Sequence, residues 1–158
     1  MELVIRPVEL SDSVDIGKYL FTKSDEIEIR EGLKIDIEKA KRGELLRIVA
    51  CIDGKVIGQC DFRKPPSPLK QHIVEVTGLV VNENFQGQRI SSGLLDYGAN
   101  WARKNNIEIM TTSVRKGTKA ENIYLHKGFN FYGELKNGII DPWKENKIYD
   151  EAFLFKKL

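Results

Sequence analysis

The stretch Leu79–Leu95 has the residue order expected of an anion-binding turn. It begins with apolar β-formers, continues through a polar turn over Asn82–Gln88, and enters an apolar-periodic helix near Ser91. The first turn of a helix leaves about four backbone N–H groups without intrahelical partners, and the helix dipole adds positive potential there. Such a turn suits a pyrophosphate, and Arg89 adds a positive charge. An ordinary strand-to-helix connection would have the same pattern, so spacing alone leaves both interpretations open.

Two segments carry motif-like spacing. In the first, the spaced positions are Phe85, Gln86, Ser91, Leu94 and Leu95. In the second, Ala120–Phe129, Tyr124 precedes the pair Gly128-Phe129. Together with the order of expected elements, these segments resemble motifs A and B of the GNAT superfamily, the acetyl-CoA-dependent N-acetyltransferases. The ending Tyr149–Phe153 also resembles the last strand of many members. Arg89 and Ser91 depart from the family pattern, because they stand where motif A carries glycines.

The resemblance implies that acetyl-CoA is the co-substrate and that no metal is needed. The main chain of Leu79, Val80 and Val81 would pair with the pantetheine arm as an added strand. Backbone N–H groups of the following turn would hold the pyrophosphate, namely those of Gln86, Gly87, Gln88, Arg89, Ile90, Ser91 and Ser92. Asn122 would replace an asparagine that the family carries before the motif B helix, and Tyr124 would complete the coenzyme site.

Acetyl transfer to an amine needs a neutral amine, a polarised thioester carbonyl and a proton for the leaving thiolate. Tyr124 matches the family's tyrosine acid, and a phenol, with a reference pKa of about 10, is protonated at neutral pH. Glu75 is the candidate base, because strict alternation along its strand puts it on one face with Thr77, Leu79 and Val81. The structural alternatives are a half-buried helical tyrosine with a surface hydroxyl and an exposed strand glutamate.

The elements that must position these residues follow from hydrophobic periodicity and turn signals. Strands are predicted over Leu3–Arg6, 46–52, Lys55–Arg63, His72–Val81, Ile107–Val114, Phe129–Leu135 and Ile148–Phe155. Helices are predicted over Asp12–Leu20 with Ser11 as cap, from Ser24 to a stop at Gly43, over Ser91–Asn105 and over Lys119–Lys127. Early hairpins and later strand–helix–strand units predict an α/β (α+β) fold with a mixed, mostly antiparallel sheet and helices on both faces. The resemblance implies that the fourth and fifth strands splay apart to hold acetyl-CoA.

The acceptor is left open as either an amine-bearing small molecule or a protein amino group. Its pocket is expected between the first two helices, the Pro-rich loop Lys64–Pro68 and the late loop Asn137–Lys147, which carries Trp143. The start of the second helix carries acidic residues that would attract a cationic amine: Asp25, Glu26, Glu28 and Glu31. A solvated helix face explains this acidic group equally well. The buried stripe of that helix is predicted to be Ile29, Leu33, Ile37 and Ala40.

Composition excludes several classes of protein. The 158 residues predict one globular domain over 1–158, and 25 Lys and Arg against 23 Asp and Glu do not favour a nucleic-acid or membrane partner. The sequence has no apolar run of the roughly 20 residues that a membrane span needs and no signal region, so we expect a cytoplasmic protein. Cys51 and Cys60 are interpreted as core residues, and His72 and His126 are too isolated for a zinc site.

Two questions stay open from the sequence. A non-catalytic acyl-CoA-binding or regulatory module on the same fold competes with the enzyme, because fold alone does not prove chemistry. The oligomeric state is also open, with a homodimer as one option, since members of the family are often dimers.

Overall fold

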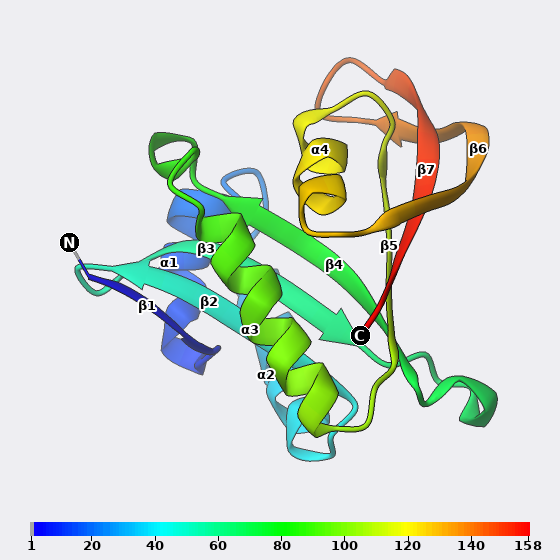
Figure 1. Cartoon of the computed structure of the whole chain (residues 1–158). Coiled ribbons are helices and arrows are strands. Elements are labelled where there is room, and N and C mark those ends of the chain that lie inside the picture. The colour runs from blue at the N-terminus through cyan, green and yellow to red at the C-terminus, as the bar shows by residue number, and fades with distance from the viewer. Residues whose placement is uncertain (1) are drawn as a thin grey trace.

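One continuous sheet organises the chain, and the computed structural model describes residues 2–158 (Figure 1). Within this range seven strands form the sheet: β1 (Leu3–Pro7), β2 (Leu45–Ile52), β3 (Lys55–Arg63), β4 (Ile73–Val81), β5 (Ile109–Arg115), β6 (Asn130–Asp141) and β7 (Lys147–Lys157). The strand order is β1-β2-β3-β4-β5-β7-β6. Every neighbouring pair is antiparallel except β4 and β5, which run parallel. The predicted mixed, mostly antiparallel sheet is therefore confirmed.

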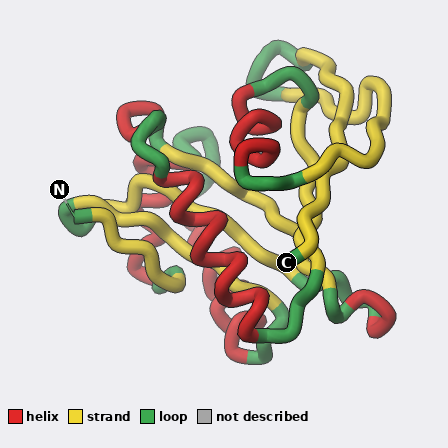
Figure 2. The backbone as a smooth tube through the Cα atoms, viewed as in Figure 1, coloured by secondary structure: helices red, strands yellow, loops and turns green. Residues whose placement is uncertain are grey.

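Helices cover both faces of the sheet, as predicted. They are α1 (Ser13–Asp15), α2 (Glu26–Lys41), α3 (Ile90–Lys104) and α4 (Lys119–His126), with short turns η1 (Leu10–Asp12), η2 (Ile16–Leu20), η3 (Pro68–Lys70) and η4 (Glu83–Phe85). In Figures 1 and 2, α3 crosses in front of the sheet, and α1 and α2 lie behind it. The larger core joins α3 and α4 to one face, and a smaller core joins η2 and α2 to the other. Among these helices none has the length and apolar character that crossing a bilayer requires.

The N-terminal helices differ from their prediction in detail. The helix expected from Asp12 is a succession of 3-10, α- and π-helical turns, capped at Glu9 and not at Ser11. The buried stripe predicted for α2 is wrong at its C-terminal end, because Ala40 is exposed. Asp36, which the predicted stripe did not include, is buried together with Leu33. A carboxylate faces inward there because arginines of the sheet bind it, as described below.

β4 and β5 separate along most of their length. They pair over only three residues each, Ile73–Glu75 with Ile109–Thr111. Beyond these pairs β4 continues to Val81 and β5 to Arg115, so the two strands open as the arms of a V (Figure 1). The splaying that the family resemblance implied is present. It leaves the edge of β4 that faces β5 without a partner strand beyond Glu75.

A bulge interrupts β4 near the opening. Thr77 lies opposite Asp61 and Val80 lies opposite Gln59, so three steps along β4 match two along β3. The extra residue is accommodated at Gly78, whose φ of +62° is a left-handed conformation that glycine adopts readily.

This bulge overturns the face assignment that alternation predicted for Glu75. The register puts Glu75 and Thr77 on the same face as Val80, the face toward α2. Leu79 and Val81 instead pack against the core under α3. Alternation holds only while a strand keeps its register, and one inserted residue moves every later side chain to the other face.

The late loop predicted over Asn137–Lys147 is also wrong. β6 continues to Asp141 and β7 begins at Lys147, so only a turn over 142–146 remains. Asn137 adopts a φ of +59°, and its N–H donates to the carboxylate of Asp150 at 2.9 Å. The left-handed residue Asn137 lies where the register of β6 with β7 shifts, between Leu135 and Ile139, and β6 continues beyond the shift. The sequence pattern predicts a loop at this shift.

Candidate active site

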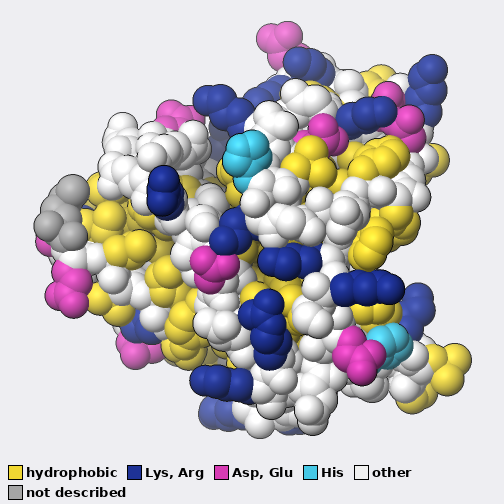
Figure 3. Space-filling model, in the orientation of Figure 1, with side chains coloured by type: hydrophobic (Ala, Val, Ile, Leu, Met, Phe, Trp, Pro, Cys, Tyr) yellow, Lys and Arg dark blue, Asp and Glu magenta, His cyan; other side chains and the backbone are white. Residues whose placement is uncertain are grey.

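A cleft of about 1360 Å³ opens where β4 and β5 diverge. One wall is the end of β4 with the N-terminal turn of α3, the other is the end of β5 with α4, and the β6–β7 hairpin borders one end. Figure 3 shows Lys and Arg side chains gathered across the middle of the face of the molecule that is turned to the viewer in Figure 1. The cationic residues of the cleft lining are Arg89, Arg115, Lys119, Lys127 and Lys144. The cleft is thus suited to a polyanionic ligand.

The structure brings nearly all the predicted coenzyme residues to this one cleft. Its lining includes Leu79, Val80, Val81, Gln86, Gly87, Arg89, Ile90, Ser91, Ser92, Asn122 and Tyr124. Gln88 is the exception, since its side chain is exposed and lies outside the lining. The two predicted segments are far apart in the sequence and meet only because β4 and β5 are neighbours in the sheet.

The turn before α3 has the geometry of an anion site. Arg89, the N-cap residue of α3, makes no side-chain cap, so no such cap occupies the first-turn N–H groups of the helix. Arg89 has a φ of +61°, the conformation that a glycine would adopt at this point. Gly87 has a φ of +79°, and a Cβ built there would meet no atom within 4 Å. The departure from motif A at Arg89 therefore leaves the glycine-type backbone in place.

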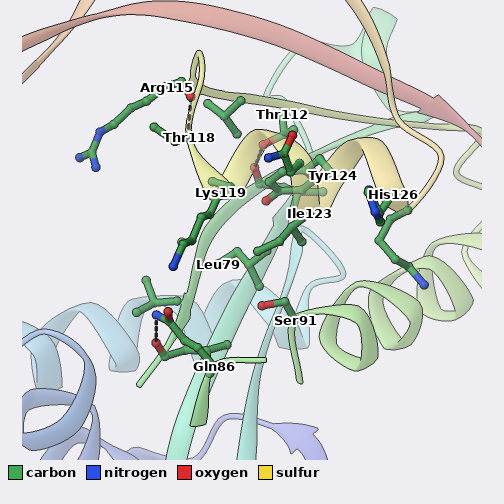
Figure 4. A pocket seen from close by; sticks show the side chains of 18 of the residues that line it. Leu79, Gln86, Ser91, Thr112, Arg115, Thr118, Lys119, Ile123, Tyr124 and His126 are labelled. Atoms are coloured by element: carbon green, nitrogen blue, oxygen red, sulfur yellow. Dashed lines mark hydrogen bonds between the residues drawn. The ribbon is translucent and has the colours of Figure 1, made fainter. Parts of the chain in front are cut away.

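Contacts from two side chains, Gln86 and Lys127, shape the walls beside this turn. The Gln86 side chain donates to the carbonyl of Val81 at 3.2 Å and ties the turn to the end of β4 (Figure 4). Across the cleft, Lys127 at the end of α4 donates to the Ser92 hydroxyl at 3.0 Å and forms an ion pair with Asp96 at 2.7 Å. The two Lys127 contacts link the end of α4 to α3 beside the turn.

Tyr124 lies deep between the walls of the cleft. It is 3% exposed, which rules out the half-buried alternative with a surface hydroxyl, and its ring packs edge-on against Phe129 at 5.0 Å. Burial raises the pKa of the Tyr124 phenol, the nearby Cys60 thiol adds to this, and hydrogen bonding with Thr112 offsets part of it. Thr112 in turn donates to the carbonyl of Val76 in β4 at 2.8 Å. The phenol is therefore held protonated at neutral pH, which is the form that donates a proton.

Glu75 also borders the cleft, and its side chain is exposed. Its neighbours across the sheet are Arg63 in β3 and Thr111 in β5. It stands where the strands begin to separate, on the face toward α2. His72 lies outside the lining of the cleft, whereas Ser113 lines it from β5.

The far end of the cleft is built by the β6–β7 hairpin, which includes the segment 137–147 that was expected to border the acceptor pocket, but the charged cluster at this end was not predicted. Arg115 lines this end, pairs with the buried carboxylate of Asp141 at 3.1 Å, and lies 5.4 Å from the ring centre of Tyr149. Lys144 and Ile139 line it as well. In Figure 4, Arg115 and His126 lie on opposite sides of Tyr124. The sequence held no signal for this cluster, because its members come together only through strand pairing.

The acceptor surface expected from the sequence is only partly present. The hairpin contributes to the cleft, but in the described residues neither the Pro-rich loop nor the start of α2 does. The four acidic residues of that helix all have exposed side chains and stand away from the lining: Asp25, Glu26, Glu28 and Glu31. Asp25 instead caps α2, accepting from the N–H of Ile27 at 2.7 Å. The solvated-face alternative therefore accounts for these residues.

Comparison with known proteins fits this geometry. The profile of the acetyltransferase (GNAT) family matches residues 15–131, which is most of the chain. The chain belongs to this family. An L-amino acid N-acetyltransferase of Escherichia coli (strain K12), AaaT, is 28% identical over 108 residues, which cover 63% of this chain and 65% of that protein.

Solved structures share the fold at low sequence identity. A ribosomal-protein-S5-alanine acetyltransferase from Vibrio fischeri is 18% identical, covers 99% of this chain and 93% of its own, and has a TM-score of 0.85. The protein yncA of Salmonella typhimurium, whose structure contains acetyl-CoA, is 16% identical, the match covers 100% of this chain and 95% of that one, and the TM-score is 0.83.

Proposed function

We propose that the protein transfers the acetyl group of acetyl-CoA to a primary amine by direct attack in a ternary complex. The observation that carries this proposal is the splayed β4–β5 cleft, which has an uncapped helix N-terminus at one wall and a buried, protonated phenol in its depth. A single domain over residues 1–158, a cytoplasmic location and the homodimer option remain predictions from the sequence.

The residues present fit acetyl-CoA. The free edge of β4 over Leu79–Val81 offers main-chain groups to the pantetheine arm, as an added strand does. The N-terminal turn of α3, with Arg89, offers N–H donors and positive charge to the pyrophosphate. Acetyl-CoA supplies the thioester, which is the activated acyl group of the reaction.

Tyr124 and Glu75 divide the proton transfers. Tyr124 holds a proton on its phenol oxygen and delivers it to the departing thiolate. Glu75 accepts a proton from the acceptor amine, directly or through water, at the point where the strands begin to separate. The two groups reach the cleft from different elements, a strand and a helix.

For the acceptor we propose an amine that also bears a carboxylate, as an α-amino acid does. The hairpin end of the cleft carries Arg115 and Lys144, and a guanidinium can bind a carboxylate with two parallel hydrogen bonds. Asp141 and the ring of Tyr149 hold that guanidinium in place. The AaaT relative carries L-amino acid acetylation in its name, which supports this acceptor class. The competing acceptor is a protein amino group, since the Vibrio fischeri neighbour is named for an alanine of ribosomal protein S5.

An acceptor panel tests the proposal. The purified protein is mixed with acetyl-CoA and with L-amino acids, the matching amino acid amides, or peptides with free N-termini, and free thiol is followed. We expect thiol release with amino acids and at least tenfold lower kcat/KM with the amides. Faster turnover of peptides would assign a protein acceptor, and binding of acetyl-CoA without turnover on any amine would assign the non-catalytic module.

Arg115→Lys examines the carboxylate contact. The variant keeps a cation beside Asp141 but loses the planar fork of the guanidinium. We expect KM for an amino acid to rise about tenfold while KM for its amide changes little. Equal effects on both acceptors would argue against carboxylate recognition at Arg115.

A further inference from the structure

A buried chain of hydrogen-bonded polar side chains connects α2 to the bulge of β4. Its central residue, Gln59 in β3, is 2% exposed and uses both ends of its amide. The side-chain oxygen accepts from Arg47 at 2.8 Å, and the side-chain nitrogen donates to the carbonyl of Gly78 at 3.1 Å. Because arginine has donors only, the Arg47 contact fixes which end of the amide faces Gly78. Gln59 therefore presents a donor to the bulge in one defined orientation.

The far side of this chain is anchored by an ion-pair network. Arg47 donates to Asp36 of α2 at 2.8 Å, and Arg63 binds the same carboxylate at 3.0 and 2.8 Å. Burial pushes the pKa of Asp36 up, but hydrogen bonds from Arg63 and Arg47 outweigh it, so the pKa is lowered and the carboxylate stays charged. Asp61 adds a second carboxylate, at 3.1 Å from Arg63. The network holds the Arg47 guanidinium firmly against Gln59.

The bulge fits closely over this chain. A Cβ at Gly78 would lie 3.1 Å from the side-chain nitrogen of Gln59 and 3.3 Å from a carboxylate oxygen of Asp61. Gly78 and Leu79 have no partners in the β3 register, so the ladder itself does not orient the peptide between them. The Gln59 side chain is therefore the hydrogen-bond donor that fixes this peptide.

The orientation of this peptide matters for the reaction. In a trans peptide the carbonyl and the following N–H point in opposite directions. With the Gly78 carbonyl held on Gln59, the Leu79 N–H points away from Gln59, and both Gly78 and Leu79 line the cleft. We propose that Gln59 is a positioning residue, which locks the bulge so that the Leu79 N–H is aimed at the thioester oxygen. This inference rests on the proposed acetyl transfer.

Two variants test the proposal without changing the size of the side chain greatly. Gln59→Met removes both hydrogen bonds, and Gln59→Glu keeps an acceptor for Arg47 but removes the amide donor to Gly78. Removing a donor to a developing oxyanion typically costs about 10²–10³-fold in kcat. Because the peptide is loosened and not removed, we expect a fall of about 10- to 100-fold in kcat for both variants. The Kd for acetyl-CoA, measured by calorimetry, should stay within about threefold of wild type.

The matched control is Asp15→Ala. Asp15 also ties a backbone group of the sheet, accepting from the N–H of Val56 at 3.0 Å, and it lies outside the cleft lining. We expect this variant to lose stability in thermal unfolding while its single-turnover rate remains that of wild type.

The outcomes separate the two proposals. No turnover by the wild-type protein on any amine would overturn the proposed function itself. An active wild type with unchanged kcat in both Gln59 variants would overturn only the positioning role. A fall in acetyl-CoA affinity in proportion to kcat would also overturn the positioning role, because a general loss of structure lowers both quantities. If Gln59→Met fails to fold, Gln59→Glu alone decides the matter by the same two measurements.

Discussion

Tyr124→Phe is the most direct test of the chemistry in the cleft. The change removes one oxygen atom from a residue that is 3% exposed, and the edge-on contact with Phe129 at 5.0 Å is kept. The lost hydrogen bond concerns a neutral hydroxyl, so we expect the free energy of unfolding to change by no more than about 1 kcal/mol. The fold and the coenzyme site should therefore survive.

The expected kinetic effect follows from the role of the phenol. General acid catalysis is typically worth about 10²–10⁴-fold, but a thiolate is already a fair leaving group. We therefore expect kcat to fall about 10- to 100-fold, which corresponds to about 1.4–2.7 kcal/mol in the barrier. KM for acetyl-CoA should change little, because the proton is delivered only in the transition state.

The assay is single-turnover acetyl transfer with a saturating good acceptor, since slow product release would hide an effect on chemistry. Tyr132→Phe is the matched control, because Tyr132 is 57% exposed on β6 and lies outside the cleft lining. A Tyr124→Phe variant with the wild-type single-turnover rate would refute the acid role and assign the proton to water or another donor.

The raised pKa of Tyr124 adds a pH signature. A phenol ordinarily loses its proton near pH 10, and burial moves this loss to higher pH. The wild-type rate should therefore show no decline from phenol ionisation below about pH 10. A decline that disappears in Tyr124→Phe and is centred well below pH 10 would contradict the buried environment seen here.

Four further changes test the coenzyme turn and the packing that supports the cleft. Gly87→Glu places a carboxylate beside the phosphates and should weaken acetyl-CoA binding at least tenfold, or about 1.4 kcal/mol, in calorimetric titration. Gly87→Ala imposes the same backbone constraint without the charge, so it should bind acetyl-CoA nearly as well as wild type does. Arg89→Gly should raise the free energy of unfolding by about 1 kcal/mol in urea titration, because the left-handed conformation at φ +61° favours glycine. Gly98→Ala should lower it by about 1–3 kcal/mol, because the added Cβ would lie 1.9 Å from a ring carbon of Phe62, and a neutral result would show that α3 can shift away. Asp36→Asn should lower it by about 3 kcal/mol by leaving two arginines without their buried carboxylate, and a loss below 1 kcal/mol would show that water replaces it.

The order of the elements and the fold class could be predicted from the sequence alone, and so could the position of the polar turn before α3. These features are local: alternation and 3.6-residue periodicity mark strands and helices, and a polar turn before α3 marks its N-terminus. For the same reason the sequence alone was enough to identify Gln86, Gly87 and Tyr124 as candidates. Each belongs to a short segment whose spacing carries the family resemblance.

Tertiary structure decided what depends on pairing between distant strands. The face on which Glu75 lies differs from the predicted one because the bulge at Gly78 is visible only in the register with β3. Burial of Asp36 depends on Arg47 and Arg63, which lie 11 and 27 residues further along the chain. A single sequence reports the periodicity of each segment but not which segments become neighbours, and side-chain partners across the sheet are set by those neighbours.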